Sequence, residues 1–149
     1  MIIVELSDPH HPQATALLRQ SHALMRSLFP PEDNFFLDID DLVAEHIRFF
    51  TARNGTEVVG TGALKLCDDY GEIKSMFVAP EARGMGAAAA LLRQLEDQAR
   101  LENLTMLKLE TGDVLTDAHR LYARHGFETC GVFGDYVTAK RSIFMEKRL

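Results

Sequence analysis

Residues 76–92 contain the residue types that bind a phosphate group. A hydrophobic strand pattern ends there at Pro80, a helix rich in Ala and Leu begins near Ala87, and the loop between them ends with Arg83, Gly84, Met85 and Gly86. Glycines let the backbone approach a bulky anion, and the first amide groups of a helix have no partner within that helix. The helix dipole adds partial positive charge at the same end, and Arg83 adds a full charge. The loop therefore predicts a binding site for a phosphate group.

Two known phosphate loops compete for this segment. A Walker loop needs Lys and then Ser or Thr after its last glycine, but Gly86 is followed by four alanines. A dinucleotide-binding turn fits Gly84, Gly86 and Ala89, and Glu110 would then be its ribose-binding acid. However, residues 80–83 separate the strand from the first glycine, and the chain is short for two mononucleotide-binding halves. The Walker loop is excluded, and the dinucleotide-binding turn stays an alternative.

A second motif lies further along the chain, where residues 118–127 read AHRLYARHGF. This segment is similar to the Ala-x-x-Leu-Tyr-x-x-x-Gly-Phe helix of the GCN5-related N-acetyltransferases (the GNAT superfamily). The loop at Arg83, Gly86 and Ala88 resembles the Arg/Gln-x-x-Gly-x-Gly/Ala loop of the same family, and two motifs in order are more specific than one. The resemblance covers residues 58–133 and extends to a small bacterial subgroup of acetyltransferases. It implies that the pyrophosphate of acetyl-CoA is bound by Arg83, Gly84, Met85, Gly86, Ala87 and Ala88.

The resemblance also implies a fold. We expect an α/β, GNAT-like single domain over residues 1–149, with a mixed, mostly antiparallel twisted sheet of six to seven strands and about four flanking helices. Its central strands, at residues 71–79 and 105–110, would be splayed apart to admit CoA. The length of the chain and its 46% content of hydrophobic residues allow one such core without disulfide support.

In that arrangement the splayed strand supplies backbone groups to the cosubstrate. The amides of Met76, Phe77 and Val78 would pair with the pantetheine arm, and one of them would donate to the thioester oxygen. Many relatives carry Asn at the position of Leu115, so Thr111 or one of its neighbours would have to replace the contacts of that Asn.

Two side chains match catalytic positions of the family. Glu72 begins the Gly-Glu-Ile strand and is the candidate general base, and Tyr122, four residues before Gly126, is the candidate acid for the CoA thiolate. A phenol titrates near ~10 and a thiol near ~8.5, so Tyr122 can protonate a thiolate without being charged. Glu72, Lys74 and Met76 alternate along the strand and should share one face. Glu72 could instead be an ion-pair partner of Lys74, and Tyr122 an ordinary core residue.

Composition and charge limit the binding partners and the cellular location that we expect. A net charge of −6 disfavours non-specific binding to nucleic acid, and no apolar run approaches the length of a membrane span. Cys67 and Cys130 lack CxxC spacing, and residues 1–6 lack the basic start of a signal peptide, so we expect a cytoplasmic protein. The six histidines form no helical pair backed by a carboxylate, so no metal site is expected.

Local patterns predict the remaining elements. We expect strands at 2–6, 48–52, 57–66, 127–133 and 142–146, and helices that begin at Pro12 and at Thr116 or Asp117. Asp40 could begin one more short helix, and Asn54-Gly55 indicates a hairpin. Gly126 should end its helix in a left-handed conformation. The helix at 87–101 should bury the stripe Ala88, Leu91, Leu92, Leu95 and Ala99.

The acceptor would enter opposite CoA, between residues 26–38 and 134–141. Acidic residues in nearby segments could attract a cationic amine, or could be ordinary solvated charges. The leading hypothesis is an acetyl-CoA-dependent N-acetyltransferase that acts on the primary amine of a small molecule by direct attack in a ternary complex. The alternatives are a protein lysine or N-terminal acetyltransferase, a CoA-binding sensor without turnover, and a dinucleotide-binding module. Whether the chain forms a homodimer stays open.

Overall fold

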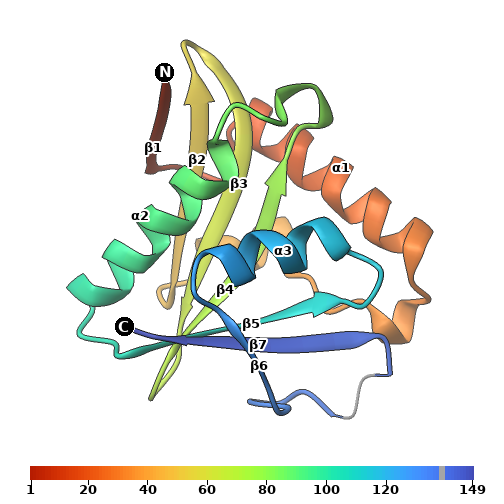
Figure 1. Cartoon of the computed structure of the whole chain (residues 1–149). Coiled ribbons are helices and arrows are strands. Elements are labelled where there is room, and N and C mark those ends of the chain that lie inside the picture. Colours follow the sequence, from red (N-terminus) through yellow and green to blue (C-terminus); the bar gives the residue numbers. More distant parts are fainter. Residues whose placement is uncertain (138–139) are drawn as a thin grey trace.

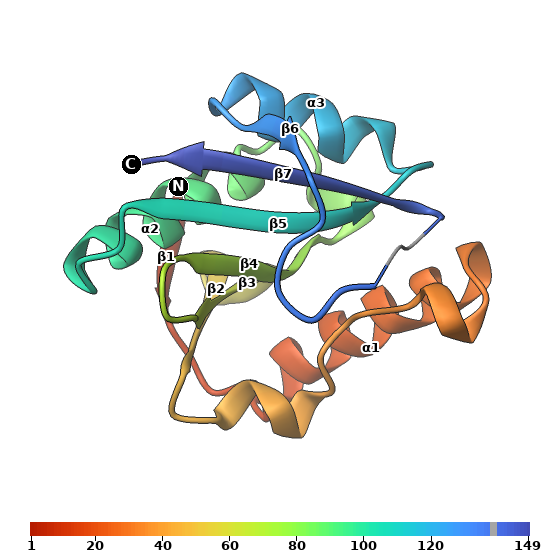
Figure 2. The same cartoon turned by 90° about the horizontal axis from the view of Figure 1, so that it is seen from below.

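The computed structural model describes residues 1–137 and 140–149, which form one seven-stranded sheet with three α-helices and three short 3₁₀-helices (Figures 1 and 2). In chain order the elements are β1 (Ile2–Leu6), α1 (Pro12–Leu28), η1 (Pro31–Asp33), η2 (Ile39–Val43), β2 (Ile47–Asn54), β3 (Glu57–Leu66), β4 (Gly71–Val78), η3 (Pro80–Ala82), α2 (Ala87–Leu101), β5 (Met106–Gly112), α3 (Thr116–Arg124), β6 (Glu128–Cys130) and β7 (Ser142–Arg148). The strand order is β1-β2-β3-β4-β5-β7-β6, and only β4 and β5 pair in parallel. The expected mixed, mostly antiparallel sheet flanked by helices is confirmed.

Helices cover both faces of the sheet, with α1 on one face and α2 and α3 on the other (Figure 2). The buried stripe of α2 is Ala87, Leu91, Leu92, Leu95 and Ala99. The predicted stripe is therefore correct except at its first residue, because the four-residue repeat of the stripe begins at Ala87, the first residue of the helix. Ala88 is only partly buried and borders the cleft described below.

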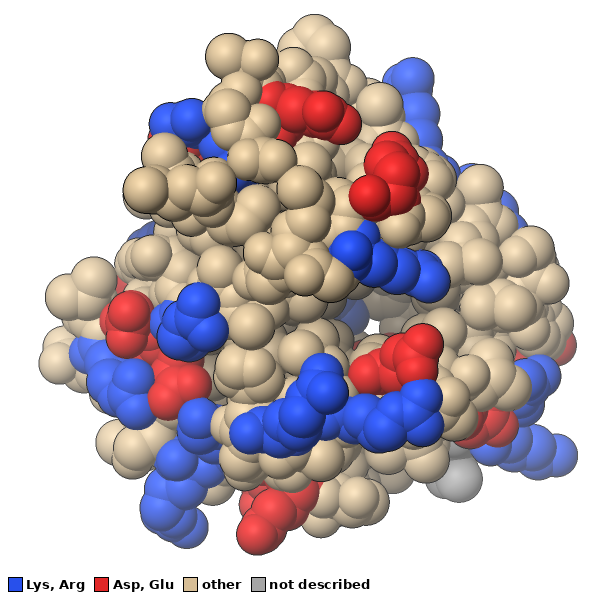
Figure 3. Space-filling model, turned by 45° about the horizontal axis from the view of Figure 1, so that its top comes forward, with Lys and Arg blue, Asp and Glu red and all other residues tan. Residues whose placement is uncertain are grey.

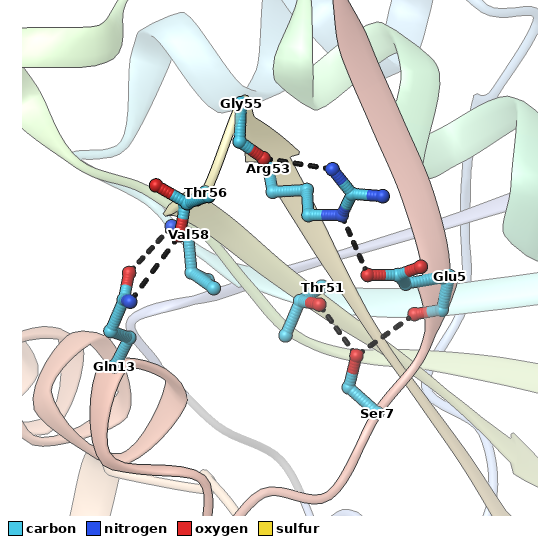
Figure 4. Close-up of polar contacts among 8 residues, drawn as sticks. All are labelled: Glu5, Ser7, Gln13, Thr51, Arg53, Gly55, Thr56 and Val58. Carbon is cyan, nitrogen blue, oxygen red and sulfur yellow. Dashed lines mark hydrogen bonds and ion pairs between the residues drawn. The ribbon is translucent and has the colours of Figure 1, made fainter.

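Polar contacts hold the start of α1 against the β2–β3 hairpin (Figure 4). Gln13 in the first turn of α1 accepts a hydrogen bond from the Val58 amide at 2.7 Å and donates one to the Thr56 carbonyl at 3.4 Å. On the neighbouring strands, Arg53 donates to the Glu5 carboxylate at 2.8 Å. Because α1 is fixed at this end, its far end and the loop that follows are directed across the sheet towards β4 and β5.

Strands β4 and β5 pair only at their beginnings. Gly71–Ile73 of β4 pair with Leu107–Leu109 of β5, and beyond Ile73 the two strands separate. A bulge in β4 accompanies this separation, because the register with β3 shifts between Thr61 and Ala63 and Ser75 has a left-handed φ of 57°. The expected splay of the central strands is confirmed.

The bulge also reverses the side-chain alternation of β4. The Met76 sulfur lies 2.9 Å from the position of a Cβ built on Gly62, beside leucines of α2, so Met76 faces α2. Lys74 pairs with Ala63, which packs with α1 on the opposite face. The prediction that Glu72, Lys74 and Met76 share one face was therefore wrong for Met76, since an inserted bulge residue shifts the period-two pattern.

Other expected boundaries differ in detail. Leu115, rather than Thr116 or Asp117, precedes α3 as its N-cap residue, and Gly126 after the helix has the expected left-handed φ of 91°. The hairpin glycine Gly55 is also left-handed, with a φ of 63°. The short helix expected at Asp40 is the 3₁₀-helix η2, and β6 has three residues instead of the expected seven at 127–133.

Part of the expected acceptor loop at 134–141, Thr138 and Ala139, lies outside the described residues. In the part of the chain that the structure does describe, no helix has the length and apolar content needed to cross a bilayer.

Candidate active site

The glycine loop leads directly into the first turn of α2. Gly84 and Gly86 have left-handed φ values of 84° and 85°, and the space around both is open, so backbone conformation rather than crowding requires glycine. Residues 83–86 are exposed, and Gly86 immediately precedes the helix. The first amides of α2 and the Arg83 guanidinium can therefore meet an anion at this point.

A cleft of about 370 Å³, here called the β4–α3 cleft, begins beside this loop. Six of the residues expected at the site line it: Met76, Phe77, Val78, Arg83, Ala88 and Tyr122. Gly84, Met85 and Gly86 form the adjoining loop, while the Ala87 side chain is buried in the core beneath it. On the face that carries α2 and α3, basic and acidic side chains are interspersed around a hollow (Figure 3).

A smaller cavity of about 150 Å³ occupies the gap between the splayed strands. It shares Met76, Phe77 and Tyr122 with the β4–α3 cleft. Glu110 and Thr111 of β5 line its other side, so Thr111 belongs to this central cavity rather than to the cleft. The splay therefore leaves a cavity within the sheet between β4 and β5.

A third hollow, here called the loop cleft, adjoins the central cavity and has a volume of about 680 Å³. Its walls are the loop after α1, the β3–β4 turn and the loop after β6. It shares Phe35, Phe36 and Lys74 with the central cavity. Residues expected at the acceptor entrance, in 26–38 and 134–141, thus border a cleft that shares lining residues with the central cavity.

Tyr122 lies where the central cavity meets the β4–α3 cleft. Its ring is 7% exposed and packs edge-on against Phe127, with the ring centroids 5.8 Å apart. Burial, and then the charge of Glu110, raise the pKa of the Tyr122 hydroxyl well above its usual value. The phenol therefore stays protonated at neutral pH, and its role as the acid for the CoA thiolate stays a prediction.

Glu110 is a site residue that sequence reasoning did not assign to catalysis. Burial raises the pKa of its carboxyl group, although a 2.6 Å hydrogen bond from Ser142 and the charge of Lys74 act in the opposite direction. Nearby, the Ser75 hydroxyl is buried and has no hydrogen-bond partner among the described residues. One sequence signal could have identified Glu110: it is an acidic residue near the end of a strand that was expected to separate from its neighbour.

Glu72 is 3% exposed and lies at the loop cleft rather than the central cavity. Its Oε2 atom accepts a hydrogen bond from the Tyr136 hydroxyl and lies 3.5 Å from the Lys74 ammonium. Lys74 also donates to the Tyr136 oxygen at 2.8 Å and to the Phe35 carbonyl at 3.0 Å. The expected ion pair of Glu72 with Lys74 is therefore present, but it is buried and joins two loops.

The two cysteines are separate, half-buried thiols. Burial raises the pKa of Cys67 and of Cys130, which keeps both sulfurs protonated at neutral pH. A thiol in that state is a poor nucleophile, so neither is suited to carry an acyl group.

Comparison with known proteins places this geometry in context. The model of the acetyltransferase (GNAT) family matches residues 14–127. The IAA acetyltransferase of Azospirillum brasilense is 37% identical in an alignment of 150 positions, and the alignment covers 99% of this chain and 98% of that protein. A structure from Klebsiella pneumoniae subsp. pneumoniae MGH 78578, described as an acyl-CoA N-acyltransferase, is 30% identical with a TM-score of 0.87 and covers 100% of this chain and 98% of its own. A GNAT family acetyltransferase from Elizabethkingia anophelis with acetyl-CoA bound shares the fold at 19% identity and a TM-score of 0.74, with coverage of 99% and 98%.

Proposed function

The chain belongs to the acetyltransferase (GNAT) family, and from that premise we propose that it transfers an acetyl group from acetyl-CoA to the primary amine of a small molecule. The acceptor amine attacks the thioester directly, in a ternary complex, without an acyl-enzyme intermediate. The observation that carries the proposal is the central cavity between β4 and β5, which shares lining residues with both the β4–α3 cleft and the loop cleft. Two substrates, one in each cleft, can meet at this cavity.

The β4–α3 cleft fits acetyl-CoA at both ends. The exposed glycine loop, the first amides of α2 and Arg83 provide the anion site for the pyrophosphate. Beyond Ile73 the strand β4 makes no pairing with β5, so its edge is available to the pantetheine arm near Met76, Phe77 and Val78. The related fold of the Elizabethkingia anophelis enzyme, which has acetyl-CoA bound, supports this assignment.

The chain's own groups account for each step of the transfer. The amine nitrogen forms a bond to the carbonyl carbon while a β4 amide donates to the carbonyl oxygen, and the carbon–sulfur bond then breaks. Tyr122 gives its proton to the departing thiolate, and a carboxylate takes the proton that the amine loses. Glu72 is the base that the sequence favours, and Glu110, on the central cavity, is the second candidate.

A small-molecule acceptor is favoured by the form of the loop cleft. Aromatic side chains, among them Phe35, Tyr70 and Tyr136, line a hollow of about 680 Å³, which is within the usual range for a small-ligand pocket. The similar Azospirillum brasilense protein is named an IAA acetyltransferase, which supports a small-molecule acceptor without identifying it.

The test is release of CoA thiol from acetyl-CoA in the presence of a panel of primary amines, including aromatic amines, polyamines, amino acids and lysine peptides. The proposal expects amine-dependent thiol release, with a product heavier than the amine by one acetyl group, for at least one small amine. Binding of CoA without turnover of any amine would favour a CoA sensor. Turnover of peptides alone would replace the small-molecule acceptor with a protein.

A further inference from the structure

The carboxylate of Glu72 already forms contacts with other side chains of the protein. The Tyr136 hydroxyl donates to its Oε2 atom, and the Lys74 ammonium lies 3.5 Å from the same atom. The side chains of Glu72 and Lys74 are only 4% and 10% exposed, so solvent reaches neither group freely. Burial, and then the Glu72 carboxylate, raise the pKa of Tyr136, which keeps that hydroxyl a donor at neutral pH.

Lys74 extends this contact to a second loop. It donates to the Phe35 carbonyl, in the loop after α1, and to the Tyr136 oxygen, in the loop after β6. The rings of Phe35 and Tyr136 meet edge-on with their centroids 5.3 Å apart. The loop after α1 and the loop after β6 are thus both hydrogen-bonded to Lys74 of β4, and both line the loop cleft.

We infer that Glu72, Lys74 and Tyr136 form a clasp that fixes the shape of the acceptor pocket, so that Glu72 is a positioning residue and Glu110 takes the proton from the amine. This inference rests on the proposed transfer reaction. The clasp consists of the contacts among Glu72, Lys74, Tyr136 and the Phe35 carbonyl.

The carboxylates of Glu72 and Glu110 line different cavities. Glu110 lines the central cavity together with Tyr122, whereas Glu72 lines only the loop cleft. The charged or titratable groups that influence Glu110 are Lys74, Glu72, Tyr122 and Tyr136. Its hydrogen-bond partner among the described residues is the Ser142 hydroxyl, which leaves the carboxylate open on the cavity side.

Ser75 lines the central cavity, as Glu110 does. Its hydroxyl oxygen is buried and has no hydrogen-bond partner among residues 1–137 and 140–149. Glu72 lines the loop cleft instead. An amine in the central cavity is therefore expected to give its proton to Glu110 rather than to Glu72.

The experiment compares Glu72→Gln, Tyr136→Phe and Glu110→Gln, with Glu96→Gln as the control. Glu96 is a partly buried carboxylate, 15% exposed, which forms ion pairs with Arg100 and Lys147 and lines none of the three hollows. Two readouts are taken: hydrogen exchange of the backbone at residues 33–37 and 131–137 on the millisecond-to-minute scale, and steady-state kinetics with the best amine of the thiol-release panel.

For Glu72→Gln and Tyr136→Phe we expect faster exchange in both loops and a KM for the amine raised roughly tenfold, as for the loss of a buried hydrogen bond to a charged group. The kcat and its pH profile should change little. Glu110→Gln should lower kcat about 100-fold and abolish the fall of the rate at acidic pH, with exchange unchanged. Glu96→Gln should alter neither readout.

The inference is overturned if Glu72→Gln lowers kcat as a lost base would while loop exchange stays at the wild-type rate. Tyr136→Phe removes only one hydroxyl group, so it still tests the clasp if Glu72→Gln does not fold. Absence of turnover by the wild-type protein with every amine would instead refute the proposed function, and the exchange measurement would still test the clasp.

Discussion

Glu110 is a partly buried carboxyl group for which we expect effects on both activity and stability. Burial raises the pKa of its carboxyl group. A group whose pKa is higher in the folded state contributes stability below its unfolded pKa, and this contribution is lost as the pH rises through the folded pKa. Glu110→Gln should therefore raise the melting temperature most at about pH 8, and the gain should disappear below about pH 4, near the unfolded value for Glu. Thermal unfolding across this range checks the prediction, and a gain that grew towards acid would contradict it.

Tyr122 makes a contrasting prediction, because the residue lines both the central cavity and the β4–α3 cleft while its ring packs in the core. Tyr122→Phe keeps the ring and removes only the proton donor. We expect kcat to fall about 100-fold, within the range found for general acids, with little change in the affinity for CoA. Thiol release gives the first quantity and titration calorimetry with CoA gives the second. A variant with normal kcat would assign Tyr122 to packing alone.

At the scale of elements, the turn into α2 should be sensitive to the loss of glycine. Gly86 has a φ of 85°, a conformation that costs a residue with a side chain roughly 1–2 kcal/mol. Gly86→Ala should lower the melting temperature by a few degrees and weaken CoA binding, because the strained turn redirects the first amides of α2. Gly131→Ala is the matched control, since Gly131 has no left-handed φ and no atom lies within 4 Å of its added Cβ. Equal effects of the two substitutions would contradict the prediction.

The elements that the sequence predicts well are those with local signals. Helix α2 and its loop follow from glycines and a four-residue apolar repeat, and the hairpin follows from Asn54-Gly55. The direction of Met76 could not be predicted, because the bulge at Ser75 arises where β3 must continue pairing while β5 diverges. The Thr61 hydroxyl donates to the Ser75 carbonyl at 2.8 Å, a tertiary contact that no local pattern encodes.

The residues of the candidate site likewise differ in whether a local sequence signal predicts them. Residues near the glycine loop and Tyr122 were found because each lies in a contiguous motif. The clasp was missed because Tyr136 reaches Glu72 and Lys74 from loops far away in the sequence, and a pairing of that kind is decided only when the sheet closes. Charge alone could not distinguish Glu72 from Glu110, since the roles that we propose for them depend on which cavity each residue lines.

For the whole molecule, ligand binding and stability are linked. A ligand that binds only the folded state at 100 times its Kd stabilises a protein by about 2.7 kcal/mol, which for a chain of this length corresponds to a rise in melting temperature of roughly 5–10 °C. The chain has a net charge of −6, so the CoA anion must be held by the local geometry of the glycine loop and Arg83 rather than by overall attraction. We therefore expect CoA to raise the melting temperature, and Gly86→Ala to reduce that rise more than Gly131→Ala does. NAD and NADH serve as controls, because each carries a pyrophosphate but lacks a pantetheine arm to pair with β4. A shift with NADH equal to that with CoA would mean that the loop binds diphosphates without using the splayed strand, and would restore the dinucleotide-binding alternative.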